Sequence, residues 1–314
     1  MNKIGKISHI FLCLVLLVCI CFGGCAKDVN GPTPSEPTSS ENDVSEVESN
    51  VEKEDDSAMY EGKTRIKVLS YNIRCLRGGE SGAGYDPLTE SQTAETIKNF
   101  SDFLDREAPD IFIVCENRMF FDAKATAADG GTKNVYDHLF KGYFRYGYNL
   151  ESGASLPRIY SKYKFLAQEY IDVDYAPGVG GGRRPLSVKI KVDDKEIYVI
   201  ACHPEAGAEV YEASRKPYFD AIAEYCKDKE NVIIAGDLNT DSELREKELD
   251  VLKEGFAFGN FGEFGTFRTY RYGKAEEQFL DNIIVKGLKM RNFKVGTEEY
   301  SDHFPMFSEL YIMD

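Results

Sequence analysis

The sequence predicts an α/β protein whose β-sheet layers are flanked by helices. Strand-like and helix-like segments mix along the chain, hairpin-like pairs and longer crossovers both occur, and no internal repeat is visible. A composition of 42% hydrophobic and 29% charged residues is typical of a globular protein. We therefore expect one globular domain, residues 62–314, with helices covering its sheet layers.

Short apolar or alternating segments bounded by turn residues predict the strands. The two central ones are joined through Asp193-Asp194, which predicts a hairpin. In chain order, the expected strands are 65–71, 111–115, 165–171, 186–192, 196–202, 232–235, 279–285 and 307–312.

Two segments are expected to be helical. Residues 89–107 carry Ala94, Ile97, Phe100 and Leu104 at helical spacing, and a proline follows them. The second helix begins or bends at a proline, and its apolar residues share one face. That proline is Pro217, and the apolar residues are Phe219, Ile222 and Cys226.

The N-terminus has the features of an export signal. Lys3 and Lys6 precede an apolar run at 10–22, which is shorter than the roughly 20 residues that span a bilayer. The sequence Phe22-Gly23-Gly24-Cys25 resembles a bacterial lipobox, in which the signal is cut before the cysteine and the thiol is acylated. We expect residues 1–24 to be a signal peptide and Cys25 to be lipidated, which would anchor an exported protein at the cell surface. Ordinary secretion, with Cys25 merely near the cleavage point, is the alternative.

Residues 25–61 are expected to form a disordered tether. They contain Pro32, Pro34 and Pro37, many serines and threonines, and almost no apolar periodicity. Ten acidic residues and two lysines between positions 26 and 56 give this segment about half of the chain's net charge of −15. Such a tether reaches roughly 30–35 Å.

The overall charge restricts the classes of partner. Because Asp and Glu total 53 against 38 Lys and Arg, a large electropositive surface for reading duplex DNA is not expected. Only four cysteines lie beyond the N-terminal segment, and their spacing matches neither a zinc site nor a disulfide framework. Two of these, Cys115 and Cys202, are expected to be buried thiols of the core.

Polar side chains stand where the predicted strands end. Asn72 follows the first strand, Glu116 the second and His203 the fifth, while Asp237 and Asn239 follow the sixth. In layered α/β folds, ligands bind beyond strand ends because loops converge there. The C-terminal part adds two more candidates, Asp281 within a strand and the triplet Ser301-Asp302-His303.

Each of these residues alone has a structural explanation. Asn72 would cap a turn, Glu116 would begin a loop, Asp281 would face solvent, and Gly236-Asp237-Leu238-Asn239 would form an Asx turn. His138 is interpreted as an ordinary surface or core histidine.

The ordered set of motifs resembles the endonuclease/exonuclease/phosphatase superfamily. Six motifs carry the resemblance, and Ile159-Tyr160-Ser161-Lys162-Tyr163 resembles that family's middle strand. The motifs are Ser70-Tyr71-Asn72-Ile73-Arg74, Glu116, Ala201-Cys202-His203, Gly236-Asp237-Leu238-Asn239, Leu280-Asp281-Asn282-Ile283 and Ser301-Asp302-His303-Phe304-Pro305. The resemblance implies a deoxyribonuclease I-like fold, a sandwich of two mixed β-sheets flanked by helices.

The resemblance also implies a metal-dependent phosphoesterase. Glu116 matches the family's metal-binding glutamate, supported by Asn72, and Asp302 is the natural second carboxylate for Mg²⁺ or Mn²⁺. Hard cations of this kind take a few carboxylate oxygens and keep several waters. The bound cation would polarise a phosphoryl oxygen while water attacks in line.

The remaining motif residues are expected to perform the chemistry. Asp237 matches the residue that orients or deprotonates the attacking water, and Asn239 would donate to a phosphoryl oxygen. Asp281 matches the partner of His303, which would hold the phosphoryl group. The general base is either His303 or Asp237, and His203 would stabilise the transition state or protonate the leaving oxygen.

Substrate identity is less determined by the sequence. The expected substrates are phosphodiesters, either nucleic acids or phospholipids, and small phosphoesters are a further class. The protein is expected to be a monomer. The sequence has no Trp and so lacks the Trp-containing segments associated with inositol polyphosphate 5-phosphatases. It also shows no basic surface for reading DNA, which weakens a match to abasic-site repair enzymes. Four arginines are candidates to clamp a phosphate, although surface solvation also explains each of them: Arg183, Arg184, Arg268 and Arg271. The alternative function is a surface lipoprotein that binds a phosphate-bearing ligand without turnover.

Overall fold

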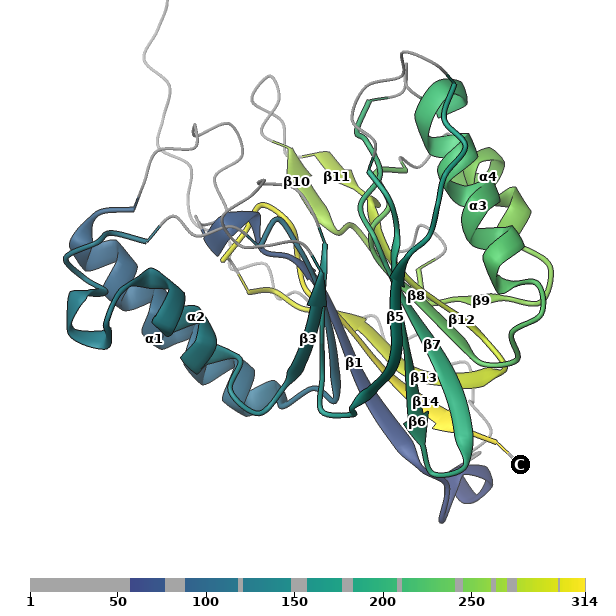
Figure 1. Ribbon diagram of the computed structural model, residues 1–314, viewed down its shortest axis with the longest axis horizontal. Coiled ribbons are helices and arrows are strands. Elements are labelled where there is room, and N and C mark those ends of the chain that lie inside the picture. The colour runs from purple at the N-terminus through teal and green to yellow at the C-terminus, as the bar shows by residue number, and fades with distance from the viewer. Residues whose placement is uncertain are drawn as a thin grey trace, which may run out of the picture. The chain divides into compact units, whose positions relative to one another are not determined.

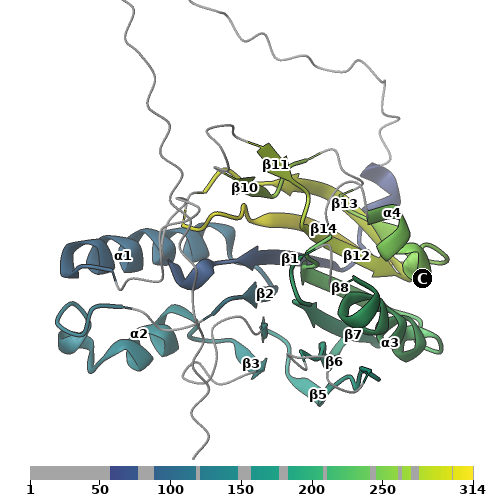
Figure 2. The ribbon, with the colours of Figure 1, turned by 90° about the horizontal axis from the view of Figure 1, so that it is seen from above.

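Two mixed β-sheets face each other, and helices cover their outer sides (Figures 1 and 2). The computed structural model describes residues 57–76, 88–117, 121–147, 157–176, 183–207, 211–240, 245–260, 264–269, 276–298 and 300–313. The predicted signal, Cys25, most of the tether and Arg271 lie outside these residues. Among the residues described, no helix is long and apolar enough to cross a membrane. The predicted sandwich of two mixed sheets is confirmed.

The first sheet has the strand order β13-β14-β1-β2-β4-β3. Strands β1 and β2 run parallel, and every other neighbouring pair in this sheet is antiparallel. The strands are β1 (Arg65–Asn72), β2 (Ile111–Cys115), β3 (Phe144–Gly147), β4 (Arg158–Ser161), β13 (Leu288–Val295) and β14 (Met306–Ile312).

The second sheet repeats this plan with the order β5-β6-β7-β8-β12-β9. Only β7 and β8 are parallel in it. The strands are β5 (Phe165–Tyr170), β6 (Leu186–Val192), β7 (Lys195–Cys202), β8 (Val232–Asp237), β9 (Ala257–Phe258) and β12 (Asp281–Lys286). A separate two-stranded ribbon is formed by β10 (Phe267–Thr269) and β11 (Glu276–Gln278).

Helices α1 (Glu90–Glu107) and α2 (Thr132–Leu139) pack on the first sheet, whereas α3 (Lys216–Cys226) packs on the second. The short α4 (Arg245–Glu248) lies near α3 in both ribbon views. Apolar side chains therefore form three clusters, one between the sheets and one under the helices of each outer face.

The boundaries of α1 follow from its sequence. Thr89 and Gln92 form a capping box, in which each side chain binds the other residue's backbone N–H. The helix ends at Ala108, whose φ of 42° is left-handed, and a proline follows. The predicted helix is confirmed. Of its predicted apolar face, Phe100 and Leu104 are buried and Ala94 is exposed, while Phe103 adds to the buried face.

Several elements were not predicted from the sequence. Strand β13 carries charged residues and lies at the edge of its sheet, so apolar alternation is weak along it. Helix α2 spans only eight residues, and β3 only four. The predicted hairpin between β6 and β7 is confirmed, and Asp193 in its turn takes a left-handed φ of 50°.

Gly236 is the position where the backbone most clearly requires glycine. It pairs with Cys202 of the parallel neighbour strand and has a φ of 139°. A β-carbon at this position would lie 2.1 Å from the carbonyl oxygen of Cys202. This close approach of β8 to β7 brings the following residue, Asp237, next to the end of β7.

We predict that Gly236→Ala lowers the free energy of unfolding by more than about 3 kcal/mol, because the added methyl group meets backbone as well as an unfavourable φ. Gly255→Ala is the matched control, since Gly255 has a φ of 80° and open space around it. The control should lose only about 1 kcal/mol. Equal losses in denaturant titrations of the two variants would contradict the close-approach argument.

Candidate functional site

The two parallel strand pairs bring the predicted site residues to one end of the sandwich. Asn72 ends β1 and Glu116 follows β2, while His203 follows β7 and Asp237 ends β8. Strands β12 and β14 run antiparallel to these neighbours, so their N-terminal ends lie at the same end of the sandwich. Asp281 begins β12 and His303 precedes β14.

Asn72 links groups from both sheets. Its buried Nδ2 donates to Asp237 Oδ2 at 3.0 Å and to Glu116 Oε1 at 3.3 Å, and it lies 3.3 Å from His303 Nε2. Its Oδ1 accepts from the backbone N–H of Arg74 at 3.0 Å. A single amide at a strand end therefore fixes the relative positions of two carboxylates, one from each sheet, and lies beside the ring of His303.

His303 and Asp281 form a buried ion pair with a distance of 2.8 Å between Nδ1 and Oδ2. Burial alone would lower the pKa of His303, but the negative charges of Asp281 and Asp237 raise it to about 10. Burial raises the pKa of Asp281 to about 6, against the opposing effect of His303. At pH 7 the pair is therefore an imidazolium and a carboxylate.

Asp237 is the most heavily contacted carboxylate of the site. Burial raises its pKa, but the positive charge of His303 and the contact with His203 outweigh burial and hold the pKa well below its usual range. Its Oδ2 lies 3.4 Å from His203 Nε2 and 3.7 Å from His303 Nε2. Its Oδ1 accepts from the backbone N–H of Asn239 at 2.9 Å. Asp237 is therefore ionised at neutral pH.

Glu116 has the properties of a metal ligand. It takes a left-handed φ of 52°, and its Oε2 is buried without a hydrogen-bond partner. An unpartnered buried carboxylate oxygen is unfavourable unless a cation binds it. The donor set of carboxylate and amide groups suits Mg²⁺ or Mn²⁺.

Asp302, the second predicted metal ligand, lies near Glu116 but already has partners. Its carboxylate oxygens lie 3.3 Å from Arg74 Nε and 3.3 Å from the hydroxyl of Ser301. Burial raises its pKa and the charge of Glu116 adds to this effect, while the charges of His303 and Arg74 oppose it. The structure therefore places negative charge from both residues in one region.

A second group of residues has ligand atoms within 4.8 Å of one another and the composition of a metal site, namely Asp237, Asp281 and His303. In this group, however, His303 Nδ1 and Asp281 Oδ2 bind each other at 2.8 Å, and Asp237 Oδ2 accepts from Asn72 at 3.0 Å. These ligand atoms therefore already have protein partners. Glu116 and its neighbours are therefore the better candidate metal centre.

The predicted phosphate-clamping arginines bind protein groups. Arg183 donates to the carbonyl oxygen of Pro204 at 2.7 Å, and Arg184 binds Asp172 at 2.9 Å. Arg268 lies on β10, and its side chain is not among those that the structure describes. A phosphate contact of these residues stays a prediction.

Two contacts of the site were not anticipated from the sequence. The hydroxyl of Thr266, in the segment before β10, accepts from the backbone N–H of Asp281 at 3.0 Å. The ring of Phe267 lies 4.7 Å from the ring of His303. Neither residue stands at a predicted strand end, so the positional pattern that identified the other site residues missed them.

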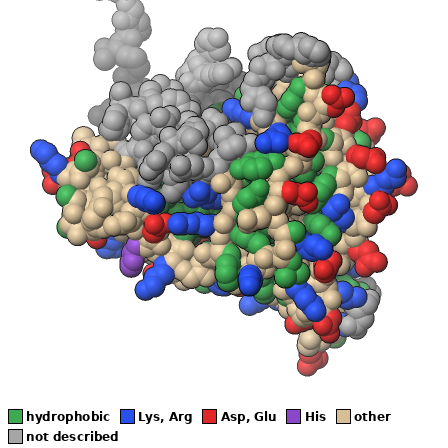
Figure 3. Space-filling view, in the orientation of Figure 1, with side chains coloured by type: hydrophobic (Ala, Val, Ile, Leu, Met, Phe, Trp, Pro, Cys, Tyr) green, Lys and Arg blue, Asp and Glu red, His purple; other side chains and the backbone are tan. Residues whose placement is uncertain are grey.

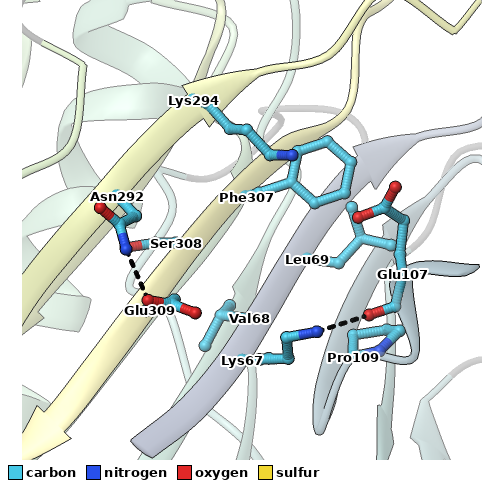
Figure 4. Close-up of a pocket in the computed structure, with 10 residues that line it drawn as sticks. All are labelled: Lys67, Val68, Leu69, Glu107, Pro109, Asn292, Lys294, Phe307, Ser308 and Glu309. Atoms are coloured by element: carbon cyan, nitrogen blue, oxygen red, sulfur yellow. Dashed lines mark hydrogen bonds between the residues drawn. The ribbon is translucent and has the colours of Figure 1, made fainter.

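A groove of about 310 Å³ lies elsewhere, on the outer side of the first sheet beside the end of α1 (Figure 4). The described residues that line it include none of the predicted site residues. Its polar groups bind one another: Lys67 Nζ donates to the carbonyl of Glu107 at 3.2 Å, and Asn292 Nδ2 donates to Glu309 at 2.6 Å. We therefore place the candidate site at the strand ends.

We predict that Asp281→Asn lowers the pKa of His303 from about 10 toward the ordinary value of 6.5, because the variant removes the main negative charge beside the imidazolium. An NMR titration of the histidine ring resonances measures this pKa. Asp250→Asn, at an exposed position, is the control and should leave it unchanged. An unaltered His303 titration in Asp281→Asn would contradict the assigned ion pair.

Comparisons with known proteins agree with this architecture. A sequence model of the Endonuclease/Exonuclease/phosphatase family matches residues 69–303. Among solved structures, truncated TDP2 from Caenorhabditis elegans is 17% identical with a TM-score of 0.58, covering 79% of this chain and 97% of that one. TDP2 from D. rerio, complexed with a single-strand DNA product, is 17% identical with a TM-score of 0.59, and the match covers 79% of this chain and 99% of that one.

A family protein from Leptotrichia buccalis is 19% identical with a TM-score of 0.57, covering 79% of this chain and 100% of that chain. No curated protein matched in the sequence search. The structural likenesses, at this level of identity, show the fold, and the family match spans most of the domain. With its two mixed sheets and its polar groups gathered at one end, the chain belongs to the endonuclease/exonuclease/phosphatase family, whose members are generally metal-dependent phosphoesterases and nucleases.

Proposed function

We propose that this protein is a divalent-metal-dependent phosphoesterase that hydrolyses phosphodiesters by in-line attack of water. The observation that carries the proposal is the gathering of three charged groups at one end of the sandwich: the imidazolium of His303, the ionised carboxylate of Asp237 and the unpartnered carboxylate oxygen of Glu116. A phosphate ester needs positive charge to bind and an oriented water to react.

Glu116, Asn72 and Asp302 would hold Mg²⁺ or Mn²⁺. The unpartnered Oε2 of Glu116 supports the assignment of this residue. When bound, the cation offsets negative charge on the phosphoryl oxygens. Burial, and to a smaller extent the charge of Glu116, raise the pKa of Asp302, and a bound cation would offset the charge of Glu116.

The protein's own residues would perform the remaining steps. His303 is a cation at neutral pH, so it would donate a hydrogen bond to a phosphoryl oxygen rather than accept a proton. Asp237 would orient the attacking water through its carboxylate, since a low pKa makes it a weak base. His203, 3.4 Å from Asp237, would stabilise charge on the leaving oxygen.

The substrate is expected to be a diester of nuclease-like or phospholipid-like type. Relatives in the fold include a TDP2 complexed with a single-strand DNA product, which supports a nucleic-acid substrate. Lys and Arg side chains are interspersed with acidic and apolar ones on the face seen in Figure 3. Together with a net negative charge, about half of which lies outside the tether, this mixture disfavours tight binding of long duplexes.

We predict that Glu116→Gln reduces the Mn²⁺-dependent hydrolysis of a chromogenic phosphodiester at least about 100-fold, because it removes a metal-binding carboxylate while keeping the side-chain size. EDTA should abolish turnover of the unaltered full chain. Glu95→Gln, at an exposed position on α1, is the matched control and should keep full activity. A wild-type protein that binds phosphate ligands and Mn²⁺ without turnover would instead support the alternative of a non-catalytic binding lipoprotein.

We also propose that the protein is exported and anchored to the membrane through lipidated Cys25. Lys3 and Lys6, the apolar run and the lipobox-like sequence support this location. We predict that Cys25→Ser moves the protein from the membrane fraction to the soluble fraction of cells. Retention of the variant in the membrane fraction would count against lipidation as the anchor.

A further inference from the structure

The segment after β7 has no regular secondary structure, yet side chains from other elements hold its backbone. It comprises residues 203–207. The N–H of His203 donates to the hydroxyl of Tyr218 on α3 at 3.1 Å. The carbonyls of four residues in the segment each accept from a side chain: His203, Pro204, Glu205 and Gly207. A segment that lacks a strand partner is therefore fixed by long-range hydrogen bonds.

Two side chains meet at the carbonyl oxygen of Pro204. Arg183 Nη1 donates to it at 2.7 Å and to the carbonyl of His203 at 3.3 Å. Asn239 Nδ2 also donates to the carbonyl of Pro204, at 2.9 Å. The position of this carbonyl therefore sets the orientation of the Asn239 amide, which we expect to contact a phosphoryl oxygen through its second N–H.

Arg215 holds the other half of the segment. Its side chain is 1% exposed, and its Nη1 donates to the carbonyls of Glu205, at 3.2 Å, and Gly207. Its Nη2 and Nε bind Glu248 Oε1 at 2.6 and 3.2 Å. The guanidinium thus joins the segment to α4 and lies at the start of α3.

A buried ion pair of this kind contributes little net stability, because desolvation of the two charges offsets their attraction. Its rigid, directional donors instead fix geometry. Here the donors of Arg215 hold the segment 203–207. Its first residue, His203, has its ring Nε2 3.4 Å from Asp237 Oδ2.

We propose that Arg215, oriented by Glu248, is a positioning residue of the active site. It fixes the backbone at Glu205 and Gly207. Through the short, continuous segment 203–207 it thereby restrains His203 and Pro204, whose positions set the His203 ring and the Asn239 amide. The proposal rests on the proposed phosphoesterase function for its kinetic test. Arg215 itself contacts neither the candidate metal residues nor Asp237 in the interactions described.

The test compares the full chain with the double variant Arg215→Met/Glu248→Met, which removes both buried charges together and keeps the interior filled. Its kcat for the chromogenic phosphodiester should fall at least about tenfold, with KM and the Mn²⁺ dissociation constant within about twofold of wild type. Arg215→Lys should give an intermediate kcat, because one ammonium cannot reproduce the guanidinium fork. The control is Arg65→Met/Glu309→Met, which removes a more exposed Arg–Glu pair with a 2.8 Å contact at the opposite end of β1.

A double variant with the kcat of wild type, or a fall in kcat equal to that of the control, would overturn the proposal. A second readout separates it from the proposed function. In NMR spectra of the full chain, the His203 ring resonances should shift in Arg215→Met/Glu248→Met and stay unchanged in the control. If wild type hydrolyses no phosphodiester, the function fails but this readout still decides the proposal. His203 resonances that coincide with those of wild type would overturn it.

Discussion

Asp237 and Asp281 lie directly opposite each other across β8 and β12, so two carboxylates are buried side by side in one sheet. Like charges in this arrangement repel strongly in a medium of low dielectric constant. The imidazolium of His303 compensates them, bonding Asp281 and lying 3.7 Å from Asp237. The rest of the site depends on this arrangement, because it keeps His303 protonated and Asp237 ionised at neutral pH.

The sheets provide the rigid frame for these charges. Hydrogen bonds from side chains hold the parts of the site that lie outside the strands. The close approach of β8 to β7, which only Gly236 permits, brings Asp237 to the end of β7. Thr266 supports the backbone of Asp281, while Arg183 and Arg215 hold the segment that carries His203. The site residues are therefore positioned by the strand ends together with hydrogen bonds from side chains elsewhere in the chain.

Much of the fold was predictable because burial leaves a clear pattern. The strand at 111–115 is buried at every position, and the strands of the β6–β7 hairpin pack into the core between the sheets. Strand β13 was missed because its charged residues face solvent at a sheet edge. The buried face of α1 was predicted in part, at Phe100 and Leu104. Burial of Phe103 was missed because it depends on contacts with Tyr71 and Phe307 of the sheet.

The sequence by itself determined which polar groups stand at strand ends, because the strand positions follow from apolar patterning. Asn72, Glu116 and Asp237 lie at or directly after strands, and His303 lies shortly before the last one. Only the tertiary structure decided what these groups contact. Partners such as Asn72 and Asp237, or Arg183 and Pro204, are separated by long stretches of chain, and their distances depend on how the two sheets pack. The protonation of His303 is decided in the same way, since burial and two carboxylates from the second sheet, rather than the histidine itself, set its pKa.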